Sequence, residues 1–279
     1  MSATPAFSCP EKVEELLSLL AEPNTVVLAG GTALIGQARR RKRHLVSLKG
    51  LGLDECRVDG RQVKIGAMCT ISQLLSVDND NHAGLAILQQ ACSRLASTFI
   101  RNAATVGGST VACFRWSDLP AALLAADATM HIASKGKEEE LSASEFFAKH
   151  PSRLFRQGAF LQSLILPRKT GRTAFSKMSP LTYGFAIWDV AVFLPEEGEG
   201  ARVGLSAGIS LPKRLTEVEK LLDEGERSRE VLEEAVTKEL SSLKVVGART
   251  VSREYRQFVG PVVVADTIIE ALENKGGQS

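Results

Sequence analysis

Two glycine pairs carry the residues best suited to hold a negatively charged ligand. Gly30-Gly31-Thr32 follows an apolar segment, and Thr105-Val-Gly-Gly-Ser109 lies between two apolar segments. Glycine adopts positive φ and has no Cβ, so backbone N–H groups in such loops can approach an anion closely. A bridging diphosphate carries about two negative charges, whereas one helix N-terminus offers only about half a positive charge. Two converging loops therefore suit a diphosphate, although an ordinary Gly-Gly turn is the better explanation of the second loop taken alone.

Neither loop has the sequence of the common nucleotide sites. Both lack G-x-G-x-x-G and G-x-x-x-x-G-K-[ST], which disfavours a Rossmann dinucleotide site and a P-loop NTPase. Asp118 can accept hydrogen bonds from ribose or ribityl hydroxyls, or it can cap a helix beside Ser117. Lys177 can face an electron-rich ring or extend its ammonium group into water, and we favour water. Phe114 and Trp116 fit a core, and one of them could also pack against a flat ring.

Histidine and cysteine patterns offer no catalytic or metal centre. The histidines occur in basic, polar or turn contexts without a nucleophile motif, so we expect each at the surface. They are His44, His82, His131 and His150. The cysteines have neither C-x-x-C nor a His/Cys cluster, which excludes the usual ligand spacings of zinc and iron–sulfur sites. We expect reduced, mostly buried thiols at Cys9, Cys56, Cys69, Cys92 and Cys113.

Composition describes a globular chain without a general attraction to polyanions. The 279 residues are 44% hydrophobic, and the net charge is only +2. This balance gives no broad pull toward nucleic acid or an acidic membrane surface. No apolar stretch approaches the ~20 residues that cross a bilayer, and no signal peptide is recognisable, so we expect a cytoplasmic protein. The basic run at 39–44 favours a solvated helix end over a docking patch.

The elements that would position the first glycine pair form a small α/β unit. Apolar residues at helical spacing predict a helix from about residue 13 to 20, and the segment 25–29 predicts a buried strand. A second helix is expected from Ala33 to about Arg41. A strand, Gly-Gly-Thr and a helix in this order form an anion-binding geometry.

The second glycine pair is expected within a larger mixed unit. Asp59-Gly60 predicts a hairpin, and Thr70 predicts the cap of a short helix. Helical spacing follows at 84–97 and after Ser117-Asp118. The segment 167–171 contains proline, glycine and basic residues and predicts a boundary. Beyond it, three consecutive strands and then helices predict a separate α+β unit.

Four segments in order resemble one protein family. They are LAGGTAL at 28–34, VKIGAMCTISQLL at 63–75, IRNAATVGGSTVACFRWSDLPAALLAADA at 100–128, and FSKMSP at 175–180 with FAIWDVAVFL at 185–194. Together they resemble the FAD-binding medium subunits of molybdenum hydroxylases, the group of xanthine dehydrogenases, aldehyde oxidoreductases and aerobic carbon monoxide dehydrogenase. The resemblance extends over nearly the whole chain.

The resemblance implies an α+β fold and a set of cofactor contacts. The fold has a two-lobed FAD-binding domain at 1–168, with lobes of about 1–53 and 54–168, and a C-terminal domain at 169–279 with a three-stranded antiparallel sheet and helices. The first loop would wrap the pyrophosphate, the second would close the other side, Asp118 would bind cofactor hydroxyls, and Leu161 would lie near the adenine. The implied contacts are Leu28, Ala29, Gly30, Gly31, Thr32, Ala33, Leu34, Thr105, Gly107, Gly108, Ser109, Asp118, Leu161 and Lys177.

The resemblance also implies a function within a complex. The chain would carry non-covalent FAD and pass electrons from a [2Fe–2S] small subunit to NAD or another acceptor, while a molybdopterin-binding large subunit oxidises the substrate. The sequence departs from the family at two points: Ser109 stands where asparagine often follows the glycines, and Cys113 to Trp116 is bulkier than usual. These departures leave open a flavin-free structural subunit. A stand-alone flavin oxidase is a further alternative.

Overall fold

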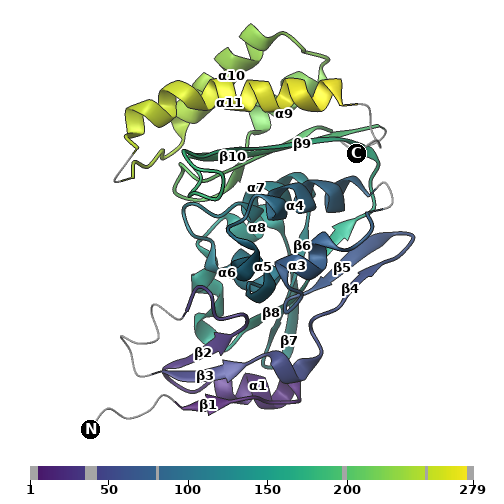
Figure 1. Cartoon of the computed structure of the whole chain (residues 1–279), viewed down its shortest axis with the longest axis vertical. Coiled ribbons are helices and arrows are strands. Elements are labelled where there is room, and N and C mark those ends of the chain that lie inside the picture. The colour runs from purple at the N-terminus through teal and green to yellow at the C-terminus, as the bar shows by residue number, and fades with distance from the viewer. Residues whose placement is uncertain (1–5, 35–42, 80–81, 197–199, 249–250, 275–279) are drawn as a thin grey trace.

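The computed structural model of the chain describes residues 6–34, 43–79, 82–196, 200–248 and 251–274. Three sheets follow one another along the molecule, from a small parallel sheet at the N-terminal end to a helix-covered antiparallel sheet at the other (Figure 1). Within these ranges, no helix combines the length and apolar character needed to span a membrane.

The first unit is a three-stranded parallel sheet with one helix against it. Its order is β1(Phe7–Ser8), β3(His44–Ser47), β2(Thr25–Leu28), and α1(Val13–Leu20) supplies the covering helix. Leu16 and Leu17 of α1 are buried in a small core with Val46. The 3-10 turn η1(Lys49–Leu51) then leads out of the unit. Because β2 and β3 are parallel, the chain must return from the end of β2 to the start of β3. The segment after β2 therefore leaves the sheet at the carboxyl ends of its strands.

The second unit is built on a five-stranded sheet. Its order is β4(Cys56–Val58), β5(Gln62–Gly66), β8(Phe160–Pro167), β6(Thr129–Ser134), β7(Lys137–Ser142). The predicted hairpin is confirmed, because β4 and β5 pair antiparallel and the Asp59 carboxylate accepts hydrogen bonds from the N–H groups of Arg61 and Gln62. Its helical segments are α3(Ile71–Leu75), α4(Ala83–Ser93), α5(Thr98–Ala103), α6(Val106–Ala112), α7(Leu119–Ala125), α8(Ala143–Phe147) and η2(Pro151–Gln157).

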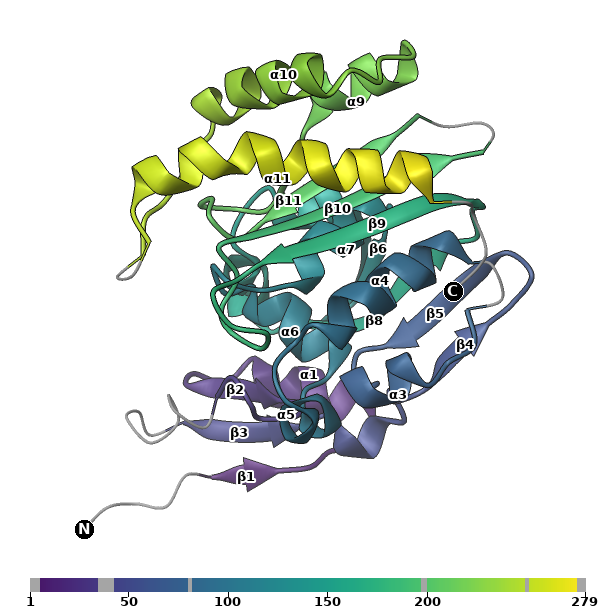
Figure 2. The same cartoon turned by 45° about the horizontal axis from the view of Figure 1, so that its top comes forward.

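The third unit is an antiparallel sheet between two helical layers. It contains the three long strands that were predicted, β9(Gly171–Met178), β10(Trp188–Pro195) and β11(Arg202–Ser206), and adds the two-residue β12(Lys213–Arg214). The helices α9(Thr216–Asp223), α10(Arg229–Ser242) and α11(Arg253–Glu273) follow. Figure 2 shows α11 along one face of the sheet and α4 and α7 toward the other.

The central strand β10 is buried on both faces, and its alternate residues enter two different cores. Trp188, Val190 and Val192 pack with the α9–α11 layer. Ala191 and Phe193 pack with residues of α4 and α7. Successive side chains of a strand point to opposite faces, so each residue of β10 can be assigned to one core from its position. The sheet therefore rests directly on the helices of the second unit.

Two expectations need correction, and a third falls mostly outside the described residues. The Thr105–Ser109 segment is not a loop, because Thr105 is the N-cap of α6 and the glycines lie in the helix. His82 is not a surface residue: it is 1% exposed and its Nδ1 accepts a hydrogen bond from the N–H of Leu85 at the start of α4. Ala33 and Leu34 lie in a turn, and the rest of the helix expected up to Arg41 falls outside the described residues, as does most of the basic run at 39–44. The segment 168–170 separates β8 from β9.

Candidate functional site

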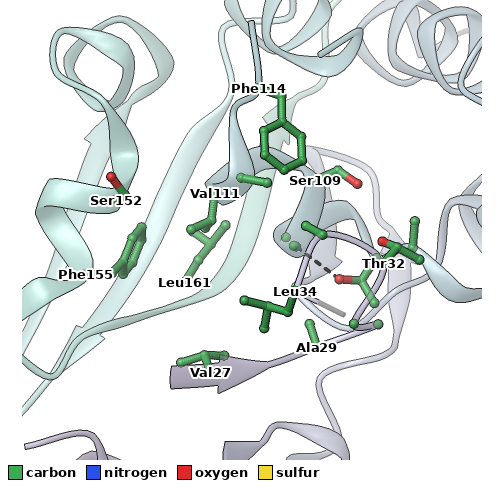
Figure 3. A pocket seen from close by; sticks show the side chains of 18 of the residues that line it. Val27, Ala29, Thr32, Leu34, Ser109, Val111, Phe114, Ser152, Phe155 and Leu161 are labelled. Carbon is green, nitrogen blue, oxygen red and sulfur yellow. Dashed lines mark hydrogen bonds between the residues drawn. The ribbon is translucent and has the colours of Figure 1, made fainter. Parts of the chain in front are cut away.

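A large cavity lies where the first and second units meet. Its volume is about 1310 Å³, and its wall contains the segment after β2, residues along α6, η2, the start of β8, Lys177 of β9 and the β9–β10 connection. In Figure 3, Thr32 and Leu34 come from the segment after β2, Ser109 and Val111 from α6, and Phe155 and Leu161 from the η2–β8 side. The cavity wall combines the hydroxyl groups of Thr32 and Ser109 with apolar side chains such as Phe155 and Leu161.

The first glycine pair forms an open backbone cradle. Gly31 has a φ of 73°, in the left-handed region that favours glycine. A Cβ at Gly30 would overlap the carbonyl oxygen of Ala103, so only glycine lets this segment lie against the end of α5. No hydrogen bond within the described part of the chain engages the N–H groups at positions 30–33. Consecutive unpaired N–H groups at a cavity wall are the donors that an anionic group needs.

The second glycine pair does not form the loop of free N–H donors that was predicted. Neither Gly107 nor Gly108 has positive φ. The first N–H groups of α6 are already bonded: Val106 donates to Cys69 O at 2.8 Å, Gly107 to Ala67 O at 3.1 Å, and Gly108 to Thr105 Oγ1 at 3.0 Å. This side therefore offers the positive end of a short helix and the Ser109 hydroxyl rather than a row of free donors.

Gly107 is required by packing rather than by turn geometry. A Cβ there would stand 2.6–2.8 Å from atoms of Ala67, which real Cβ atoms do not tolerate. A Cβ at Gly108 would stand 2.8 Å from Thr105 Oγ1 and 3.6 Å from Ala29 Cβ. The two glycine segments thus approach each other closely, and α6 is held against the loop after β5.

Asp118 and Lys177 form a buried ion pair on the cavity wall. Lys177 Nζ lies 2.8 Å from Asp118 Oδ1, and their side chains are 4% and 6% exposed. Lys177 also donates to the carbonyl oxygen of Arg94 at 3.0 Å. The expectation that Lys177 extends into water is therefore wrong. Asp118 occupies the N-cap position of α7, but its side chain makes no capping hydrogen bond.

Burial governs the ionisation of Asp118. Loss of water raises the pKa of this carboxyl to about 6 from 3.8, and the positive charge of Lys177 acts in the opposite direction. A carboxylate held by one lysine still has lone pairs for the hydroxyl groups of a ligand, because a carboxylate offers about four acceptor positions. The geometry permits the hydroxyl-binding role, and the alternative role as a helix cap is not realised.

The structure brings together nearly all the residues that the resemblance implied. Leu161 is 3% exposed on β8 and lies on the cavity wall. Leu28 is the exception. It is not part of the wall, whereas its neighbour on β2, Val27, is. The wall includes Ala29, Gly30, Gly31, Thr32, Ala33, Leu34, Thr105, Gly107, Gly108, Ser109, Asp118, Leu161 and Lys177.

Sequence reasoning named Phe114 and Trp116 as candidates to pack against a ring but missed Tyr183 and Phe185, which join them at the cavity. Phe114 stacks on Trp116 with ring centroids 5.2 Å apart, and Trp116 meets Phe185 at 4.6 Å. The guanidinium of Arg101 lies 5.9 Å from the ring centre of Tyr183. These rings come from the turn before α7 and from the β9–β10 connection, and all four line the cavity. The aromatic residues in the connection after β9 were a visible signal, but nothing in the sequence placed that connection beside Trp116.

Among the described residues, no group of three or more His, Cys, Asp or Glu side chains could hold a metal ion. The cysteines there are free: Cys9 is exposed, Cys56 is half-buried, and the other three are buried. The site is thus a cavity with backbone donors, a helix end, hydroxyls, one buried ion pair and aromatic rings. Such a set can hold a large, partly anionic and partly flat molecule.

Comparisons with known proteins agree with this geometry. The family described as the FAD binding domain in molybdopterin dehydrogenase matches residues 3–169. The chain is 30% identical over 263 residues to the uncharacterized protein YgfM of Escherichia coli strain K12, covering 93% of each. It is 28% identical over 274 residues to subunit alpha of the 6-hydroxypseudooxynicotine dehydrogenase complex of Paenarthrobacter nicotinovorans, covering 94% of this chain and 92% of that one.

Solved structures share the fold. The chain is similar to a chain of the carbon monoxide dehydrogenase from Hydrogenophaga pseudoflava with a TM-score of 0.88, at 21% identity and with 98% of both chains covered. It is also similar to a chain of quinoline 2-oxidoreductase from Pseudomonas putida 86 with a TM-score of 0.85, at 21% identity, covering 96% and 97%. The family match spans more than half of the chain and includes both glycine segments. The chain belongs to the family of oxidoreductases that carry the FAD-binding domain of molybdopterin dehydrogenases.

Proposed function

We propose that this chain is the FAD-carrying electron-transfer subunit of a multi-subunit molybdenum hydroxylase. In this proposal it takes electrons from iron–sulfur clusters of a small partner subunit and passes them through non-covalent FAD to NAD or another acceptor. Molybdopterin belongs to a large partner subunit. The observation that carries the proposal is that the N–H groups at 30–33, which have no hydrogen-bond partner within the described residues, line the same cavity as the N-terminal end of α6.

The residues of the chain fit the parts of FAD by their chemistry. The N–H groups at 30–33 and the Ser109 hydroxyl suit the diphosphate. Asp118 suits the hydroxyls of the connecting sugar and ribityl groups. Leu161 and Phe155 provide apolar surface for a ring, as do Phe114 and Trp116 nearer β9. When bound, FAD supplies the redox chemistry, and the protein supplies binding, orientation and electrostatics.

Two relatives whose names refer to multi-chain dehydrogenases favour a relay over an independent oxidase. The P. nicotinovorans protein is a dehydrogenase complex subunit, and a Sulfolobus acidocaldarius relative, 24% identical over 262 residues, is the medium chain of glyceraldehyde dehydrogenase. The substrate-oxidising centre would thus lie on another polypeptide.

Reconstitution and reduction test this proposal. The folded chain is expected to take up FAD, and its flavin is expected to be reduced by an oxidisable substrate only when the partner subunits are present. Anaerobic NADH should bleach the bound flavin if NAD is the acceptor. A folded chain that does not bind FAD would support a flavin-free structural subunit, and substrate-dependent bleaching of the isolated chain would support a stand-alone oxidase.

A further inference from the structure

Asp189 is a buried acidic residue in the centre of the C-terminal sheet. On β10 it stands directly opposite Lys177 of β9 and Ser206 of β11. Ala191 and Phe193 share its face and pack against α4 and α7, so Asp189 points to the same side. Its exposure is 0%. A row of three polar side chains therefore crosses the sheet beneath the start of α7.

This row is connected to the cavity wall through the turn before α7. Ser206 Oγ donates to Ser117 O at 3.1 Å, and Lys177 Nζ lies 2.8 Å from Asp118 Oδ1. Neither carboxyl oxygen of Asp189 accepts a hydrogen bond from a donor in the described residues. Lys177 stands opposite Asp189 on β9 and contacts Asp118, so the carboxyl groups of Asp118 and Asp189 lie near the same ammonium group and can interact with each other.

Two carboxyl groups in contact need a proton between them. One cation, Lys177, cannot neutralise two buried carboxylates, and an ionised carboxylate without donors is costly in an apolar core. A single proton on Asp189 resolves both difficulties, because Asp189 then becomes a donor to Asp118 and the cluster has no net charge. The carboxylate of Asp118 is left paired with Lys177 at the wall of the cavity.

We propose that Asp189 is a positioning residue that stays protonated at neutral pH, donates its proton in a hydrogen bond to Asp118, and so holds the Asp118–Lys177 ion pair at the wall of the cavity. The assignment of a role toward FAD rests on the proposed function. The protonation itself rests on the burial of Asp189 opposite Lys177 and on the second carboxyl group, that of Asp118, beside the same lysine. It adds a residue outside the cavity wall to those that shape the site.

The surroundings of Asp189 favour its protonated form. Burial raises the pKa of Asp189 well above its usual value, and the charge of Asp118 raises it further, while Lys177 opposes both. From α4, burial also raises the pKa of the Cys92 thiol, so this neighbour of Asp118 is neutral. From β11 the facing residue is Ser206, which does not titrate in this range. Lys177 is thus the cation of the cluster, and one proton balances it.

Infrared spectroscopy of the apo chain with ¹³C-labelled aspartate tests the protonation directly. The wild type is expected to show the C=O band of a protonated aspartic acid at pH 7. Asp189→Asn should remove it, since the amide replaces the acid while still donating to Asp118. The control Asp266→Asn changes a half-exposed partner of Arg229 on α11 and should leave the band. The proposal would be overturned if the wild type lacked the band or if Asp189→Asn kept it. The first of these outcomes is measured on the wild type alone and does not depend on the folding of a variant.

The pH dependence of FAD binding tests the positioning role. Above the pKa of Asp189, the wild type should lose affinity by up to tenfold per pH unit, because one proton is linked to binding. Asp189→Asn should bind FAD at pH 7 within about threefold of the wild type and lack this alkaline loss. Equal pH profiles in the two proteins would contradict the role. Failure of the wild type to bind FAD at any pH would instead count against the proposed function and leave the infrared result to stand separately.

Discussion

Lys177 Nζ lies 2.8 Å from Asp118 Oδ1, and this contact joins the first strand of the C-terminal sheet to the start of α7. Both side chains are almost fully buried. The C-terminal unit therefore contributes a charged group to the cavity, in addition to the aromatic rings of the β9–β10 connection. This contact, together with the glycine segments, determines which substitutions should affect the site.

Replacing Lys177 with Met should destabilise the chain in a pH-dependent way. The substitution leaves Asp118 buried without a cation, for which a loss of about 3–5 kcal/mol in the free energy of unfolding is typical. The folded-state pKa of Asp118, already raised to about 6, should rise further. Stability carried by a raised carboxyl pKa is present at low pH and is lost as pH rises. Urea unfolding should show a larger deficit at pH 8 than at pH 5, and a deficit that does not change with pH would argue against the pair.

Ser109 provides a matched test of charge at the second glycine segment. Asp and Asn have nearly the same size, but only Asp adds a negative charge beside the diphosphate. A like charge within the site should weaken FAD binding by about 1–4 kcal/mol, or roughly fivefold to nearly a thousandfold. Ser109→Asn should bind FAD at least as well as the wild type. Fluorescence titration of both variants measures the difference, and equal affinities would place the diphosphate elsewhere.

Gly30 tests the cradle at the first glycine segment. Gly30→Ala places a Cβ on the carbonyl oxygen of Ala103, so the backbone must shift. Overpacking of this kind costs about 1–3 kcal/mol, and we expect FAD retention to fall with it. Gly60→Ala is the control, since nothing lies within 4 Å of the Cβ it would add. Flavin content after gel filtration should drop in the first variant and stay unchanged in the second; retention of full flavin by Gly30→Ala would refute the cradle.

Thr105 tests the helix end. Its Oγ1 accepts the hydrogen bond of Gly108 N–H at 3.0 Å, and the residue is 3% exposed. Thr105→Val keeps the shape but removes the acceptor and should cost about 1 kcal/mol, whereas Thr105→Ser keeps the acceptor. Thermal unfolding should rank Ser above Val. The opposite order would show that the methyl packing of Thr105 matters more than its hydrogen bond.

Local signals in the sequence predicted the hairpin and the capped helix of the second unit. Asp59-Gly60 and Thr70 act through contacts within a few residues, and the structure has both: the β4–β5 turn and the capping box of Thr70 with Gln73. The Thr105 segment was assigned wrongly because the assignment used only such local signals. A glycine pair reads as a turn, but the requirement at Gly107 comes from Ala67, which is distant in sequence.

The missed parts of the site depend on tertiary contacts. Asp189 sits inside an apolar strand, and its significance appears only when β9 places Lys177 opposite it. The meeting of Trp116 with Phe185 likewise joins segments that no spacing rule connects. His82 was expected at the surface because its neighbours are polar, yet it begins a buried helix. Cofactor contacts, by contrast, were predicted mainly from the resemblance to a family, and all but Leu28 lie on one cavity wall.

Calorimetric titration of FAD into the folded apo chain tests the central claim most directly. The site described above predicts saturable binding of one FAD per chain, weakened in Ser109→Asp and retained in Ser109→Asn. Circular dichroism and a cooperative unfolding transition should verify that the protein used is folded. A folded wild-type chain that gives no saturable FAD binding would contradict the claim that the two glycine segments form a dinucleotide site.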